Sequence, residues 1–231
     1  MTNRIATRIP TGIPGLDEIL HGGFVSGRTY LVTGAPGTGK TIFGLHFLAA
    51  AEKGARPLFV SFTQTEHHLR MDAESVNIPK ESISFLDLTP EARVFSEEQS
   101  YDIFSPVEVE RDPIARAMRS RIEELNPPRV FIDGFSELRM VSSDLFHFVR
   151  MAQSFFRFVT DRGATVVVSS TEGLTDVDVA LQAITDGVIR FVGRPPLRSV
   201  EVIKMRGGDF RAGVHPLRIT STGLEILRDS A

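Results

Sequence analysis

A glycine-rich segment that ends in lysine and threonine is the strongest chemical signal in the chain. Residues 34–41, GAPGTGKT, satisfy the pattern G-x-x-x-x-G-K-[ST] of a phosphate-binding loop (P-loop). Glycines allow backbone N–H groups to curl around phosphate oxygens, and the N-terminus of the following helix adds partial positive charge. In such loops the lysine reaches the β- and γ-phosphates, and the hydroxyl of the last residue ligates Mg²⁺. We therefore expect a nucleoside triphosphate and Mg²⁺ to bind at Gly34, Pro36, Gly37, Thr38, Gly39, Lys40 and Thr41.

A carboxylate, Asp133, directly follows the apolar run of residues 129–132, RVFI. The carboxyl ends of parallel strands meet at one edge of a sheet, so we expect Asp133 near the P-loop. There it can hold the Mg²⁺ hydration shell together with Thr41. The alternative is an aspartate that only caps a loop. We favour the metal role, because a P-loop requires such a partner.

Apolar runs and helical spacings alternate along the chain as far as Asp186. Apolar and β-branched runs predict strands at 28–33, 57–62, 83–88, 129–132 and 164–169. Helical spacing predicts helices at 39–53, 66–76 and 113–125, and a fourth that is capped within 142–144 and ends at Gly163. From Asp186 onward the pattern changes to consecutive short strands, which predicts antiparallel hairpins. The fold class is therefore α/β, with a mainly parallel central sheet flanked by helices and antiparallel strands at its C-terminal end.

The composition restricts the classes of function. The 231 residues fit one domain, which we take to be residues 1–231. A net charge of −3 gives no basic field for nucleic acid or membrane, and the absence of cysteine excludes disulfides, thiol catalysis and cysteine-bearing metal sites. No apolar run approaches the ~18 residues of a membrane span, and prolines and glycines interrupt the N-terminus. We therefore expect a cytoplasmic protein, in which the acidic, aperiodic residues 89–112 form a surface excursion.

Three further motifs make the chain resemble the KaiC-like branch of RecA-type ATPases. They are residues 11–23, TGIPGLDEILHGG; residues 170–172, STE, after the strand that follows Asp133; and residues 204–207, KMRG, on a late strand. Their order and spacing cover residues 5–228. The resemblance implies a RecA-like fold, ATP and Mg²⁺ as ligands, and a homo-oligomeric, often hexameric, ring with nucleotide at the subunit interfaces. The best-known member carries two such domains in one chain, and this chain has room for one.

The resemblance also implies a role for Lys204 and Arg206. In that family the Lys and Arg of the K-M-R motif reach the γ-phosphate bound by the neighbouring subunit. Alternation along a strand puts both side chains on one face and Met205 on the other. The alternative is two solvated charges on an edge strand. We favour the role in the neighbour's site, where the pair would act like an arginine finger.

The chain departs from the family at residues 62–64. The family has Phe-Glu-Glu there, and one glutamate polarises the attacking water, whereas this chain has Phe-Thr-Gln. The amide of Gln64 cannot act as a general base, but it can orient a water. Glu66 is a possible substitute, although an early acid at a helix start is the simpler explanation. We therefore expect slow hydrolysis. The predicted catalytic residues are Lys40, Gln64, Asp133, Lys204 and Arg206.

Three other features of the sequence bear on function. The family's clock protein has adjacent Ser and Thr phosphoacceptors before Ile-Thr-Asp, but Gln182-Ala183 stand there in this chain, so clock-type autokinase activity is not expected. The stripe of Phe148, Phe155 and Phe156 is expected to belong to the core rather than to stack on bases. Residues 139–140, Arg-Met, are expected in a solvated loop, with a ring pore as the alternative location.

The sequence thus predicts one RecA-like domain that binds ATP·Mg²⁺, assembles as a homo-oligomeric ring, most simply a hexamer, and works as a nucleotide-dependent regulatory or signalling switch with a signalling protein as partner. Two alternatives stay open. One is a scaffold that binds ATP with almost no turnover, which Gln64 favours. The other is a RecA-type DNA repair or recombination ATPase, which would need a basic or aromatic surface for the strand.

Overall fold

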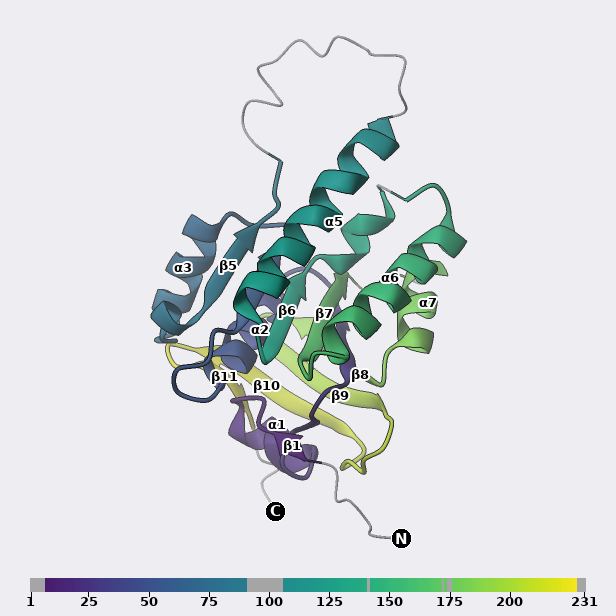
Figure 1. The fold of residues 1–231 in the computed structure, drawn as a ribbon. Helices are drawn as coiled ribbons and strands as arrows, with labels where there is room; N and C mark the ends of the chain where they lie inside the picture. The colour runs from purple at the N-terminus through teal and green to yellow at the C-terminus, as the bar shows by residue number, and fades with distance from the viewer. Residues whose placement is uncertain (1–6, 91–105, 141, 172, 174–175, 228–231) are drawn as a thin grey trace, which may run out of the picture.

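The computed structural model describes residues 7–90, 106–140, 142–171, 173 and 176–227 (Figure 1). Strands and helices alternate through most of this part of the chain. The strands are β1 (Arg8–Ile9), β2 (Phe24–Val25), β3 (Thr29–Gly34), β4 (Leu58–Ser61), β5 (Ser84–Asp87), β6 (Arg129–Asp133), β7 (Thr165–Thr171), β8 (Gly187–Arg194), β9 (Leu197–Met205), β10 (Val214–Thr220) and β11 (Gly223–Ile226). The helices are α1 (Pro14–Ile19), α2 (Lys40–Ala49), α3 (Glu66–Ser75), α5 (Pro106–Leu125), α6 (Leu145–Thr160) and α7 (Asp176–Ile184), with the 3₁₀ helices η1 (Lys80–Ser82) and η2 (Phe135–Arg139).

The strands from β3 onward form one sheet in the order β11-β10-β9-β8-β3-β7-β6-β4-β5. The pairs β3–β7, β3–β8, β6–β7, β4–β6 and β4–β5 are parallel. The pairs β8–β9, β9–β10 and β10–β11 are antiparallel. The predicted α/β class, a mainly parallel sheet with antiparallel strands at one end, is therefore confirmed. It is the fold of a RecA-like P-loop NTPase.

Helices cover both faces of the parallel part of the sheet (Figure 1). The helices α1, α2 and α3 pack on one face, where Phe43 of α2 lies in the core, and α5, α6 and α7 pack on the other, where Phe148 of α6 is buried. The central strand β3 supplies both cores, since Tyr30 and Val32 face the first and Leu31 the second. This two-sided burial explains why the parallel strands are continuous apolar runs.

Several helices differ from the sequence-based expectation, and the short α1 is not predicted at all. The helix α2 ends at Ala49 rather than at residue 53, because its apolar spacing stops there and the next residues turn toward β4. The helix α5 begins at Pro106, so the predicted start at Pro113 is wrong, and residues 106–112 are helical rather than irregular. An internal proline removes one i→i−4 hydrogen bond but leaves helix on both sides. The helix α7 is not predicted by the sequence pattern, in which Val177 and Val179 alternate as they would in a strand.

The remainder of the predicted surface excursion, residues 91–105, lies outside the described residues. The predicted cap of the fourth helix is confirmed, since the Asp144 carboxylate accepts a hydrogen bond from the backbone N–H of His147 at 2.8 Å. Arg139 belongs to η2 rather than to a loop, so that expectation is wrong, while Met140 just after it is exposed as expected. Among the described helices, none is both long and apolar enough to cross a membrane.

Candidate functional site

The P-loop joins β3 to α2 at the carboxyl edge of the parallel strands. Its three glycines have positive φ angles, +156° at Gly34, +79° at Gly37 and +114° at Gly39, which directly precedes α2. A Cβ on Gly34 would lie 2.4 Å from the carbonyl oxygen of Phe191 on the neighbouring strand β8. These positions therefore favour glycine, and the loop can turn tightly enough to present its backbone to a ligand.

Lys40 is the first residue of α2, and its side chain folds back onto the loop. Its Nζ donates to the carbonyl oxygen of Gly34 at 2.6 Å and to that of Ala35 at 3.0 Å. The N–H groups in the first turn of a helix have no partners within the helix. One ammonium and several backbone N–H groups therefore lie at the same end of α2, which is the arrangement that binds phosphate.

Three hydroxyl groups surround the carboxylate of Asp133, which ends β6 and is buried. Thr41 Oγ1 donates to Asp133 Oδ2 at 2.8 Å, and Thr63 Oγ1 donates to the same oxygen at 3.4 Å. Ser169 Oγ donates to Oδ1 at 2.5 Å and accepts from the backbone N–H of Gly134 at 2.9 Å. Only β7 separates β3 from β6, and this order brings the P-loop and Asp133 together.

The oxygens of Thr41 and Asp133 fit Mg²⁺. They are hard ligands that already lie 2.8 Å apart, and Mg²⁺ characteristically takes one or two carboxylates while water and phosphate oxygens complete its octahedron. Within the described residues there is no group of three or more His, Cys, Asp or Glu that could hold a metal on protein ligands alone. The chemistry of this pair therefore suits a metal that arrives with a nucleotide.

These groups border a cavity of about 470 Å³, which we call the phosphate cavity. That volume lies within the range of roughly 300–1,000 Å³ typical of small-molecule sites. The lining combines the P-loop with side chains after β4, on α3, in η2, on β7 and on β10. The lining residues are Pro36, Gly37, Gly39, Lys40, Thr41, Ile42, Thr63, Gln64, Asp72, Asp133, Gly134, Glu137, Ser169, Thr171 and Ile219.

Gln64 lines the phosphate cavity, and its amide is held by a carboxylate of α3. Its Nε2 donates to Asp72 Oδ2 at 3.1 Å, and its backbone N–H donates to Ser61 Oγ at 3.0 Å. With the nitrogen so engaged, the amide oxygen is the atom that can accept a hydrogen bond from a water in the cavity. Glu66 instead pairs with Arg70 at 2.7 Å and, unlike Gln64, does not line the phosphate cavity.

Arg198 of β9 contacts the P-loop, and no sequence motif marked it. Its Nε and Nη2 both donate to the carbonyl oxygen of Gly37 at 3.1 Å. Asp72 and Glu137, which line the phosphate cavity, were also missed. All three come from elements that reach the cavity only through the tertiary fold, so local spacing carries no signal for them.

Lys204 lies at the other end of β9 from the phosphate cavity of its own chain. It is six residues beyond Arg198, or about 20 Å at about 3.4 Å per strand residue. Its Nζ donates to the carbonyl oxygen of Gln182, and Arg206 Nη2 donates to that of Ala183 at 3.2 Å, both near the C-terminus of α7. Burial, followed by the charge of Arg206, lowers the pKa of Lys204.

The two cations share a side although Arg206 lies just past the end of β9. Met205 between them is buried, as the alternation predicted. Both head groups reach α7, whose carbonyl ends favour positive charge. Within one chain, Lys204 and Arg206 thus bind the C-terminal end of α7. They lie far from the phosphate cavity of the same chain, so a role in the site of a neighbouring subunit is a proposal.

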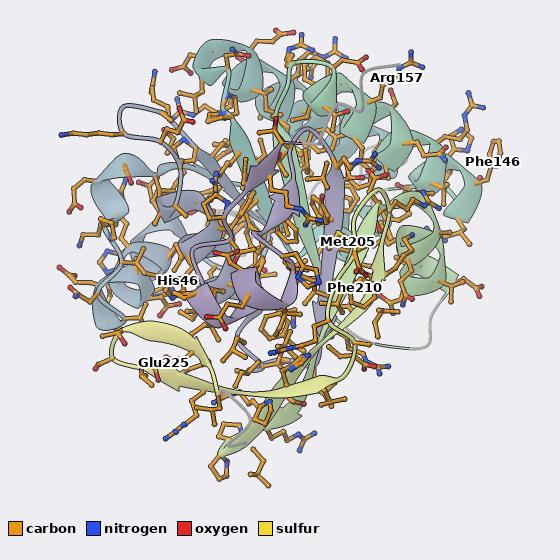
Figure 2. The ribbon with its side chains drawn as sticks, turned by 90° about the horizontal axis from the view of Figure 1, so that it is seen from below. His46, Phe146, Arg157, Met205, Phe210 and Glu225 are labelled. Atoms are coloured by element: carbon orange, nitrogen blue, oxygen red, sulfur yellow. The ribbon has the colours of Figure 1, made fainter. Side chains whose placement is uncertain are left out.

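The phenylalanine stripe of α6 belongs mainly to the core. Phe148 and Phe156 are buried, which confirms the expectation, and Phe155 is half-buried beside them. Phe146 and Arg157, which lie on the same helix outside the stripe, project away from the body of the molecule (Figure 2). This helix therefore offers no row of aromatic rings on which bases could stack.

A family model for the ATPase KaiC matches residues 9–231. The chain belongs to the KaiC family of ATPases. The match includes the P-loop, the Asp133 strand and residues 204–207, so the resemblance drawn from the motifs is confirmed. Membership shows nucleotide use at the level of the family.

Two kinds of relative share this domain. The chain is 26% identical to the circadian clock protein KaiC2 of a Synechocystis species and 29% identical to the circadian clock oscillator protein KaiC of Parathermosynechococcus lividus. These matches cover 95% and 94% of this chain but only 40% and 41% of the clock proteins, so the chain spans about two fifths of their length. It is also 28% identical to a UPF0273 protein of Thermotoga maritima, and there the match covers 95% of both chains.

Proposed function

We propose that this KaiC-family chain binds ATP with Mg²⁺ in the phosphate cavity and hydrolyses it slowly. The observation that carries the proposal is the convergence of Lys40, Thr41 and Asp133 on one cavity at the end of β3. Lys40 would exchange its contacts with the loop carbonyls for the β- and γ-phosphates. Thr41 and Asp133 would hold Mg²⁺. Bound there, Mg²⁺ would neutralise charge that develops on the phosphate oxygens.

Slow turnover follows from the residue nearest the attacking water. The oxygen of Gln64 can accept a hydrogen bond from that water and orient it, but an amide takes no proton. Asp72 keeps the amide in the orientation that leaves this oxygen available. Since phosphoryl transfer depends mostly on positioning and charge stabilisation, we expect a low rate rather than none.

The proposed assembly is a homo-oligomeric ring of single domains, most simply a hexamer. Lys204 and Arg206 lie about 20 Å along β9 from their own P-loop, so they cannot touch the nucleotide of the same chain. They would complete a site only in a neighbouring subunit, as the K-M-R pair of the family does. A ring with shared sites would couple nucleotide state to assembly, which suits a regulatory or signalling switch that acts on a partner protein.

A scaffold that holds ATP with almost no turnover is the second candidate, and Gln64 is the observation that favours it. A DNA repair ATPase is less well supported, because the net charge is −3 and α6 carries no exposed aromatic row.

Light-scattering mass, measured with and without ATP·Mg²⁺ and paired with phosphate release, tests the proposal. We expect a ring-sized mass with ATP·Mg²⁺ and slow phosphate release. A monomer under all conditions would contradict the shared site. Assembly without measurable release would support the scaffold, and DNA-stimulated release would support the repair ATPase.

A further inference from the structure

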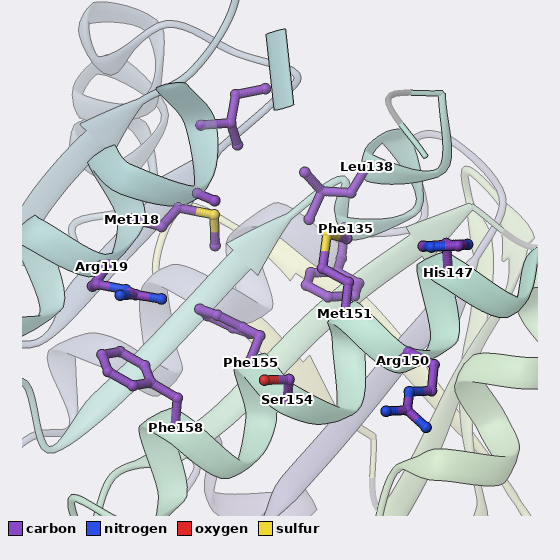
Figure 3. A pocket seen from close by; sticks show the side chains of 12 residues that line it. Met118, Arg119, Phe135, Leu138, His147, Arg150, Met151, Ser154, Phe155 and Phe158 are labelled. Atoms are coloured by element: carbon purple, nitrogen blue, oxygen red, sulfur yellow. The ribbon is translucent and has the colours of Figure 1, made fainter. Parts of the chain in front are cut away.

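A second cavity, of about 460 Å³, lies between α5 and α6 on the face of the sheet opposite α2 (Figure 3). We call it the α5–α6 groove. The buried side chains of Met118, Phe135 and Leu138 line it, and the half-buried Met151 and Phe155 of α6 form one wall. Thioether and aromatic groups pack well against irregular apolar surfaces. The groove is therefore suited to the apolar part of a ligand.

The charged side chains that line the groove are basic. Arg119 lies on the α5 side, 5.9 Å from the ring centroid of Phe158, and Arg150 lies on the α6 side (Figure 3). Neither arginine has an ion-pair partner among the described residues. His147 also lines the groove, and its Nδ1 lies 3.2 Å from Asp144 Oδ2. Asp144 is the one acidic residue among the described contacts of the lining residues. The basic side chains that line the groove therefore complement a negatively charged ligand.

We propose that the α5–α6 groove binds an amphiphilic anion, a carboxylate carried on an apolar chain of medium length. The chain would lie on Met118 and Phe135, where it leaves water. The carboxylate would pair with Arg119 or Arg150, because a guanidinium can donate two parallel hydrogen bonds to a carboxylate. The volume lies in the range of roughly 300–1,000 Å³ that small ligands occupy. None of these side chains lines the phosphate cavity, so the proposal goes beyond the proposed function and does not depend on it.

The groove and the phosphate cavity share one short element, η2. Phe135 and Leu138 line the groove, whereas Gly134 and Glu137 line the phosphate cavity. Asp133 directly precedes this segment. A ligand that packs against Phe135 thus contacts the segment that follows the proposed metal ligand, which gives the groove a position from which it can act on the nucleotide site.

Calorimetric titration of the full chain with laurate, below its critical micelle concentration, tests the proposal. Dodecyltrimethylammonium has an apolar chain of the same length with a cationic head group. We expect it to bind at least about tenfold more weakly than laurate. Arg119→Gln combined with Arg150→Gln should weaken laurate binding by about tenfold or more, since both charged donors are lost. A direct block comes from Ser154→Trp, because Ser154 lines the groove and is exposed. Gln153→Trp is the matched control, since Gln153 is exposed on the same helix but does not line the groove.

Loss of laurate binding in Ser154→Trp, with binding retained in Gln153→Trp and equal melting temperatures for both, would support the proposal. Absence of laurate binding to the wild-type chain would overturn it, as would equal affinity for the two amphiphiles or unchanged binding in Ser154→Trp. Laurate binding that appears only after the acidic residues 91–105 are replaced by a Gly-Ser linker would assign the groove to that segment of the chain, and would also overturn it.

Discussion

Substitution of Gln64 by glutamate would supply a general base that the proposed mechanism lacks, but the neighbouring Asp72 carboxylate would oppose its ionisation. A general base is worth roughly 10²–10⁴-fold in rate. Gln64 Nε2 lies 3.1 Å from Asp72 Oδ2, so Gln64→Glu would set two carboxyl groups side by side. Two negative charges at that separation repel by about 1 kcal/mol in water and by about 5 kcal/mol at an effective dielectric constant of about 20. Repulsion near the upper value keeps one of the two groups protonated at neutral pH.

We therefore expect Gln64→Glu alone to accelerate phosphate release by less than about tenfold at pH 7.5. Gln64→Glu combined with Asp72→Asn should accelerate it by about 100-fold or more, because asparagine removes the repelling charge and leaves the new carboxylate ionised. The advantage of the double variant should shrink as the pH rises, since the single variant then loses its shared proton. The ATP affinity of the double variant should match that of wild type, because the attacking water is not part of ground-state binding.

The assay is single-turnover phosphate release, with assembled protein in excess over ATP·Mg²⁺, and Asp72→Asn alone is the control. A double variant that is no faster than wild type at any pH between 6 and 9 would refute the reasoning. Brisk hydrolysis by the wild-type chain, near the enzyme median of about 10 s⁻¹, would refute it as well, because a carboxylate elsewhere would then be the base.

Three further outcomes are expected. Burial lowers the pKa of His46, whose Nε2 accepts a hydrogen bond from the β11 backbone at 3.0 Å; the unfolded chain thus binds more protons below about pH 6.5, so the melting temperature should fall more steeply toward pH 5 in wild type than in His46→Gln. Lys204→Ala with Arg206→Ala should slow phosphate release and spare ATP binding, and mixing with Lys40→Ala chains should restore part of the rate; no recovery despite proven subunit mixing would argue against shared sites. Arg198→Ala should weaken ATP binding by about fivefold in calorimetry, because a P-loop carbonyl loses its charged partner, and an unchanged affinity would show that this contact does not shape the loop.

The sheet could be predicted from the sequence because its parallel strands are unusually apolar. Residues 129–132 and 164–169 are buried on both faces, so their patterns have no competing interpretation. The helices were harder to delimit. Pro113 suggested a helix start but lies inside α5, and the alternating valines of α7 hid its helical period. Local patterns thus identify the elements, whereas their ends depend on packing.

The candidate site divides in the same way. The P-loop and Asp133 carry local signals, since one is a contiguous motif and the other ends an apolar strand. Arg198 could not be assigned to the P-loop without knowing that β9 runs toward it. The length of the same strand separates Lys204 from the P-loop of its own chain. This separation is what supports a site shared between subunits.

The central claim is that the P-loop binds ATP with Mg²⁺, and calorimetric titration of ATP in the presence of Mg²⁺ tests it most directly. The account predicts about one ATP per chain for wild type and an affinity at least about tenfold weaker for Lys40→Ala, because a charged hydrogen-bond donor disappears from beside the triphosphate. The exposed Lys53, which lies outside the phosphate cavity, provides the matched control, and Lys53→Ala should bind as wild type does. Equal affinities for wild type, Lys40→Ala and Lys53→Ala would contradict the assignment of the phosphate site.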